Sequence, residues 1–92
     1  GYLGDRMLVG YYHIYGRSQD PQCAELINFL STSGFEYVLT LTDFSSEYEH
    51  LITKRYDRDH TPIVTAVTIT GEEEMIGGFD EALEYMKTMM KG

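Results

Sequence analysis

The chain has 92 residues, enough for one small domain, and a domain of this size buries roughly two-thirds of its unfolded surface. Fifteen acidic and seven basic residues give a net charge of −8, which argues against nucleic acid or an anionic membrane as partner, because phosphate groups need clustered Lys and Arg. No apolar run approaches the ~20 residues of a membrane span. The single cysteine excludes an internal disulfide and favours a reducing compartment, so we expect a cytoplasmic protein.

Residues 1–6 (GYLGDR) precede Met7 and carry no recognisable pattern. We interpret them as a leader or a remnant of expression, with the folded domain over residues 7–92. The alternative, that the chain is a module of a longer protein, stays open.

The first half of the chain predicts a strand, a helix and a second strand. Tyr11–Tyr15 is short, aromatic and β-branched, which is typical of a buried strand. Asp20 followed by Pro21 indicates a helix start, because Asp caps the first turn and Pro is tolerated at the first helical position. Gly34 fits the end of that helix, and Phe35–Leu41 is rich in β-forming residues. The helix places four apolar side chains on one buried stripe, namely Cys23, Leu26, Ile27 and Leu30.

The second half predicts a helix, two strands and a final helix. Ser46 and Glu49 fit a capping box at the start of a helix over 47–56, and Ile63–Thr70 is the most β-branched strand. Glu72–Glu74 is expected to be a solvated turn before a short strand at 74–76, and the last helix runs over 80–90. Along one side of the first helix fall Tyr48, Leu51, Ile52 and Arg55. The last helix is expected to bury Phe79, Leu83, Met86 and Met90.

The element order is therefore β-α-β-α-β-β-α. A strand–helix–strand unit requires a right-handed crossover between parallel strands, whereas two strands joined by a tight turn are antiparallel. The sequence thus predicts an α/β fold with a four-stranded mixed sheet and helices on both faces.

Three motifs lie at defined places in this element order: Asp20-Pro21-Gln22-Cys23, Thr61-Pro62, and Gly77-Gly78-Phe79-Asp80. Together they resemble the glutaredoxin family over essentially the whole chain from Met7 onward, and the ending IGGFDEALEYM is similar to the small glutaredoxins of bacteriophages. The resemblance implies a thioredoxin-like fold, a place in thiol–disulfide exchange and cell redox homeostasis, and glutathione as co-substrate or ligand.

The resemblance also implies a glutathione-binding cleft. Thr61 would precede a cis Pro62 and pair through its backbone with the cysteine of glutathione. Gly78 would allow a close approach of the ligand, and the Phe79 amide with the Asp80 side chain would hold the γ-glutamyl end at a helix N-terminus. The alternative is purely structural: a bare glycine turn, a bare helix cap and an ordinary strand start.

Basic residues complete this expected cleft. By the same resemblance, Arg17 and Arg58 fall where relatives keep basic residues near the glycine carboxylate of glutathione, and Arg55 is a weaker candidate. His60 adjoins the Thr61–Pro62 pair and is a further candidate for the cleft. His13 is expected to be a satisfied residue of the sheet.

The chain departs from the family at its active site. Asp20 stands where the family has its attacking cysteine, and a carboxylate cannot form a mixed disulfide, because the thiolate is the attacking species. Cys23 is the remaining catalytic candidate, yet it lies in the buried stripe, where a thiol has a raised pKa and is inert. The missing first cysteine also removes the cluster ligand of relatives, and the histidines lack metal-ligand spacing, so we expect no iron–sulfur cluster and no metal.

Two functions from different classes stay open. The first is a glutathione-dependent thiol–disulfide oxidoreductase that works through Cys23, with glutathione or a protein thiol or disulfide as partner. The second is a redox-inactive binding module of the same fold, for a peptide or protein partner. Asp20 motivates the second function, and the retained cleft motifs are compatible with both.

Overall fold

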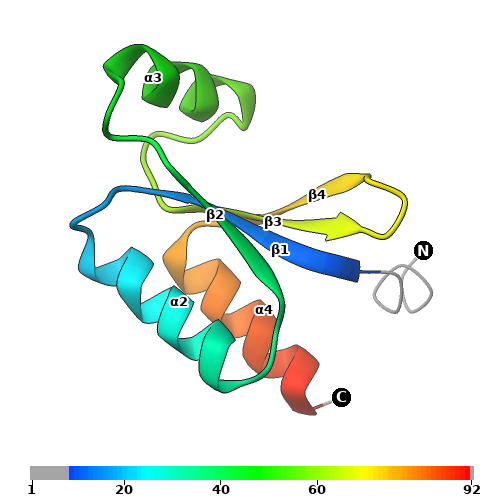
Figure 1. Ribbon diagram of the computed structural model, residues 1–92. Coiled ribbons are helices and arrows are strands. Elements are labelled where there is room, and N and C mark those ends of the chain that lie inside the picture. Colours follow the sequence, from blue (N-terminus) through cyan, green and yellow to red (C-terminus); the bar gives the residue numbers. More distant parts are fainter. Residues whose placement is uncertain (1–8, 92) are drawn as a thin grey trace.

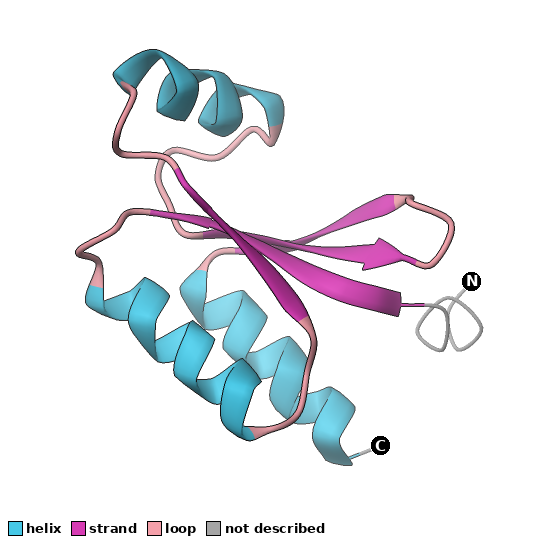
Figure 2. Cartoon of the chain, in the orientation of Figure 1, coloured by secondary structure: helices cyan, strands magenta, loops and turns pink. Residues whose placement is uncertain are grey.

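The computed structural model describes residues 9–91, so the predictions made for residues 1–6 and for Met7 fall outside the described residues. Figures 1 and 2 show four strands and three helices in the predicted order. In chain order the elements are β1 (Val9–Gly16), α2 (Pro21–Thr32), β2 (Tyr37–Leu41), α3 (Ser46–Arg55), β3 (Ile63–Thr68), β4 (Glu73–Gly77) and α4 (Phe79–Lys91).

The strands form one mixed sheet in the order β2-β1-β3-β4. β1 pairs in parallel with β2, and β3 runs antiparallel to both β1 and β4. Tyr12 lies opposite Tyr37 on one side and Ala66 on the other. This topology confirms the predicted four-stranded mixed sheet. Only the first strand–helix–strand unit joins parallel strands, because β3 runs antiparallel to β1 and therefore also to β2.

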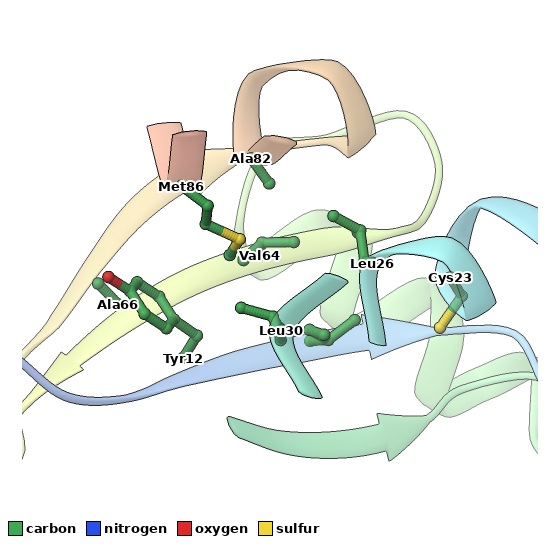
Figure 3. Packing of buried hydrophobic residues seen from close by; sticks show 9 residues of the cluster. Tyr12, Cys23, Leu26, Leu30, Val64, Ala66, Ala82 and Met86 are labelled. Atoms are coloured by element: carbon green, nitrogen blue, oxygen red, sulfur yellow. The ribbon is translucent and has the colours of Figure 1, made fainter. Parts of the chain in front are cut away.

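Helices lie on both sides of the sheet. α2 and α4 lie side by side against one face, whereas α3 lies on the opposite side, near one end of the strands (Figure 1). The main core fills the space between the sheet and the helices α2 and α4, and Figure 3 shows how its side chains meet there. Its buried members are Tyr12, Ile14, Cys23, Leu26, Leu30, Val64, Ala66, Ala82 and Met86.

A second, smaller core joins α3 to the sheet. Tyr15, Ile52 and Ile63 are buried in it, and Tyr48 and Tyr56 pack against them. Because strand residues alternate between faces, Tyr15 serves this second core while its neighbour Ile14 serves the main one.

A polar cluster lies beside the second core. The Glu73 carboxylate accepts hydrogen bonds from the hydroxyls of Tyr56 (2.7 Å), Thr65 (3.0 Å) and Tyr15 (3.4 Å). The His13 ring stacks on Tyr15 at 4.1 Å. Burial raises the pKa of Tyr15, and the Tyr56 hydroxyl and Glu73 carboxylate raise it further. Glu73 is exposed, as predicted, but it belongs to β4 rather than to the turn, and its carboxylate is hydrogen-bonded to these hydroxyls.

Three other local predictions differ from the structure. The cap of α3 is Ser45, whose hydroxyl accepts the Tyr48 amide at 3.1 Å, and not Ser46. Met90 was expected to be buried, yet it is 56% exposed. The side chains placed along one side of α3 do not share one environment, because Ile52 is buried whereas Leu51 is 50% exposed. Arg55 is exposed as well. The reason is geometric, because α3 meets the sheet only near one end and α4 extends beyond the main core.

None of the helices in the described part of the chain is long and apolar enough to cross a membrane.

Candidate functional site

The start of α2 is fixed by Asp20. Its side chain accepts the Gln22 amide at 3.0 Å, and its carbonyl accepts the Ala24 amide at 3.1 Å. With Pro21 at the first helical position, this is the predicted cap. The carboxylate therefore occupies the free amides to which a thiolate at this position would be exposed.

Cys23 faces the interior, as predicted from its place in the apolar stripe. It is 1% exposed and belongs to the main core, in the layer with Leu26 and Leu30 (Figure 3). Burial raises the pKa of the Cys23 thiol, and the Asp20 carboxylate raises it further. The sulfur also lies so close to Gly16 that a Cβ built there would be 2.6 Å from Sγ. Cys23 is thus a packed thiol with little thiolate character.

Two cavities meet beside the start of β3. The larger has a volume of about 380 Å³, the smaller about 260 Å³, and His60 lines both. The Thr61–Pro62 peptide bond is cis, and its two residues divide between the cavities: Thr61 lines the larger and Pro62 the smaller. We call this pair of cavities the cleft.

The residues that the sequence placed in a ligand site lie around this cleft. Arg17 and Thr61 line the larger cavity, and the smaller one is lined by Arg58, Pro62, Gly78, Phe79 and Asp80. Gln22, from the first turn of α2, also lines the smaller cavity, so the α2 start borders the cleft. Neither Asp20 nor Cys23 lines it.

The glycine pair sets the approach to α4. Gly77 has a φ of 142°, which favours glycine, and a Cβ there would lie 2.6 Å from the Glu81 Cβ. The Gly78 carbonyl accepts the Ala82 amide at 3.0 Å, and the Gly78 amide donates to Glu81 Oε1 at 2.7 Å. The bond from the Gly78 amide to the Glu81 side chain is one of the two hydrogen bonds of a capping box, and glycine has no side chain to make the other. The Gly78 hydrogen bond is the main cause that lowers the pKa of Glu81.

Each cleft arginine is paired with a carboxylate of the chain itself. Arg17 Nη1 lies 2.7 and 2.8 Å from the two carboxylate oxygens of Glu49, and the buried Thr42 hydroxyl donates to Glu49 at 3.0 Å. Arg58 Nη2 lies 3.4 Å from Glu81 Oε1. Neither glutamate was singled out from the sequence as a cleft residue.

The signals for these two glutamates differ. Glu81 follows Gly78 by three residues, so a capping-box search at the last helix would have found it. Glu49 was interpreted as a cap partner of Ser46, and nothing local indicates that it meets Arg17, 32 residues away. The other lining residues missed by the sequence reasoning are Ser46, His50, Thr53 and Asp59.

Within residues 9–91, no three His, Cys, Asp or Glu side chains are grouped as they would be around a metal ion. His13 instead lies 2.7 Å from the Thr40 hydroxyl, within the sheet as predicted.

No protein-family model and no curated protein sequence matches the chain. Solved structures do match. A wheat glutaredoxin is 16% identical with a TM-score of 0.66, over 90% of this chain and 77% of that one. A buckwheat glutaredoxin–glutathione complex is 16% identical with a TM-score of 0.65, over 92% and 76% of the two chains. A dithiolic glutaredoxin of Trypanosoma brucei brucei is 23% identical with a TM-score of 0.61, over 95% and 88%.

These similarities cover 90% or more of the chain with TM-scores above 0.6. The chain therefore has the thioredoxin-like α/β fold, in the arrangement that glutaredoxins adopt.

Proposed function

We propose that this protein binds glutathione in the cleft and belongs functionally to the thiol–disulfide exchange proteins, with weak or altered redox activity of its own. The observation that carries the proposal is the meeting of Thr61–Pro62, the α4 start and both arginines around His60. These segments are far apart in the sequence, and a purely structural role for each motif does not require that they share one cleft.

The expected pose of the ligand follows from the motifs. The Thr61 backbone would pair with the cysteine of glutathione, and the Phe79 amide with the Asp80 side chain would hold its γ-glutamyl end. Arg17 and Arg58 would serve its glycine carboxylate. The buckwheat relative was solved as a complex with glutathione, which supports the choice of ligand.

The expected weakness of the exchange step follows from Asp20 and Cys23. In thiol–disulfide exchange a thiolate attacks a disulfide sulfur, a new S–S bond forms, and the displaced thiolate takes up a proton. Asp20 cannot take part, and Cys23 is 1% exposed with a raised pKa. Exchange through Cys23 therefore needs a local opening of the α2 start.

The same observation favours a second candidate function, a redox-inactive binding module for a peptide or protein partner. In that case the cleft serves recognition alone. A protein thiol partner and a cytoplasmic location fit both functions, because both concern a single-cysteine protein in a reducing compartment.

The decisive test restores the missing thiol. In a glutathione-coupled disulfide reduction assay, we expect the parent to be nearly inactive and Asp20→Cys to raise the rate by roughly tenfold or more, because a thiol at a helix N-terminus has thiolate character. The introduced thiolate attacks the glutathionyl sulfur of a mixed disulfide between glutathione and the substrate, and the substrate thiolate is displaced and takes up a proton. A glutathione thiolate then attacks the glutathionyl sulfur bound at position 20, which releases oxidised glutathione and regenerates the introduced thiolate.

Two controls accompany this assay. Asp20→Ser should remain inactive, because it retains the cap without a thiol. Cys23→Ser in the Asp20→Cys background should retain most of the gain, whereas in the parent it removes whatever activity Cys23 supplies. If Asp20→Cys gains nothing, and calorimetry detects no glutathione binding to the parent at millimolar concentration, the proposed function is wrong.

A further inference from the structure

We propose that Glu49 and Glu81 are internal competitors for ligand carboxylates: each occupies the cationic group that a carboxylate of glutathione would use. The inference rests on the proposed function, because it concerns the affinity and selectivity of the same cleft. It adds that the cleft discriminates against ligands with free carboxylates.

At the α4 end of the cleft, Glu81 uses two donors at once. Its Oε1 accepts the Gly78 amide at 2.7 Å and lies 3.4 Å from Arg58 Nη2. A Cβ added to Gly78 would lie 3.4 Å from each of these same two groups, Arg58 Nη2 and Glu81 Oε1. A ligand carboxylate that approaches Gly78 therefore meets another carboxylate beside the guanidinium.

At the other end of the cleft, Glu49 holds Arg17 more firmly. The Glu49 side chain is only 23% exposed, and it combines the Arg17 contact at 2.7 Å with the hydrogen bond from the buried Thr42. Because the Thr42 backbone amide donates to the Gly16 carbonyl at 2.9 Å, the residue that holds Glu49 is itself fixed to the end of β1. Arg17 is thus presented to the larger cavity already neutralised.

The charges of the side chains that line the cleft also disfavour a ligand carboxylate. Two arginines, Arg17 and Arg58, face four carboxylates, so the lining has a net charge of −2 with its histidines neutral. The four carboxylates are Glu49, Asp59, Asp80 and Glu81. Like charges at close range disfavour binding, so a ligand carboxylate has to displace an internal one, whereas an esterified ligand does not.

The experiment compares two ligands on five proteins. Glutathione and its diethyl ester are titrated calorimetrically into the parent, Glu81→Gln, Glu49→Gln, and the charge-matched controls Glu84→Gln and Glu47→Gln. The controls lie on the same helices and line neither cavity of the cleft. Gln at position 81 retains the capping hydrogen bond, because Glu and Gln both serve at that place in a capping box.

We expect Glu81→Gln and Glu49→Gln each to tighten glutathione binding by roughly two- to fivefold, the range measured for releasing a partly exposed ion pair. The affinity for the diethyl ester should change much less, and both controls should match the parent with both ligands.

The outcomes separate the inference from the proposed function. If glutathione binds the parent and all variants alike, the inference is overturned while the proposed function stands. An equal gain in the controls also overturns it, since net charge alone would then explain the effect. If neither ligand binds any of the five proteins, both fail, because removal of a competitor should have exposed the site.

Discussion

Asp20 shows how one residue can retain a local structure while it changes the chemistry. Its carboxylate caps α2 through the Gln22 amide, and this helix end would equally stabilise a thiolate. Because either anion satisfies the same amides, the fold does not require a cysteine at this position. An aspartate at this position therefore supplies the complete cap without a thiol.

Gly16 is a position at which the packing against the core residue Cys23 leaves no room for a side chain. An added Cβ would lie 2.6 Å from the Cys23 sulfur, a distance that forces the neighbours to shift. We expect Gly16→Ala to lower the free energy of unfolding by about 1–3 kcal/mol, the usual cost of overpacking. Urea denaturation measures the loss.

Gly10 provides the matched control. It lies on the same strand, and its added Cβ would come no closer than 3.5 Å to any neighbour, so Gly10→Ala should be much milder. Combining Gly16→Ala with Cys23→Ala should recover part of the loss, because the sulfur is gone while the Cys23 Cβ, at 3.3 Å, remains. Strict additivity of the two changes would count against a direct clash.

At the scale of elements, the sequence predicted those features that depend on a few neighbouring residues, such as helix starts, turns and strand propensity. The Asp20–Pro21 start and the Gly34 turn with φ of 80° lie where the sequence placed them. The β-branched third strand begins at Ile63 as predicted, but it ends at Thr68 rather than at Thr70. What the sequence could not show is how far α3 overlaps the sheet, and this decides the exposure of Leu51. Docking depends on contacts between residues far apart in the chain, which periodicity does not contain.

In the candidate site, too, the features set by neighbouring residues could be predicted, whereas those set by contacts between distant residues could not. Each of its motifs was visible locally, and the structure places them around one cleft, although the ligand they hold remains a prediction. The pairing of Arg17 with Glu49 was not visible, because it exists only once α3 stands beside the end of β1.

The cap of α3 offers a direct test at this scale. Ser45 and Ser46 are adjacent, and the structure assigns the cap to Ser45 through its contact with the Tyr48 amide. We expect Ser45→Ala to destabilise the protein by about 1 kcal/mol, and Ser46→Ala to stay within about 0.5 kcal/mol of the parent. Thermal and urea unfolding of the two variants gives the comparison, and a reversed order would return the cap to Ser46.

At the scale of the whole molecule, the two faces of the sheet differ in character. One face carries the apolar core under α2 and α4, whereas the other gathers hydroxyls, the His13 ring and the Glu73 carboxylate. Burial lowers the pKa of His13 from its ordinary 6.5, and the opposing effect of Glu73 is smaller. The folded protein therefore holds this ring neutral more strongly than the unfolded chain does.

Global stability should consequently fall in mild acid. Because the unfolded chain binds the proton more readily, the contribution of His13 is fully present above its unfolded pKa of 6.5 and is lost as the pH drops toward its lower folded value. We expect His13→Gln to flatten the stability profile below pH 6.5. Parallel stability profiles for His13→Gln and the parent would contradict this assignment.

The Glu73 carboxylate also connects α3 to the sheet through Tyr56. Residues of α3 form much of the wall of the larger cavity, including Ser46, Glu49 and Thr53, while the chain directly after α3 is tethered to β4 by the 2.7 Å bond from Tyr56 to Glu73. This bond joins the end of α3 to the β3–β4 hairpin. The wall of the larger cavity is thus held in place partly by Glu73, a side chain that does not line the cavity.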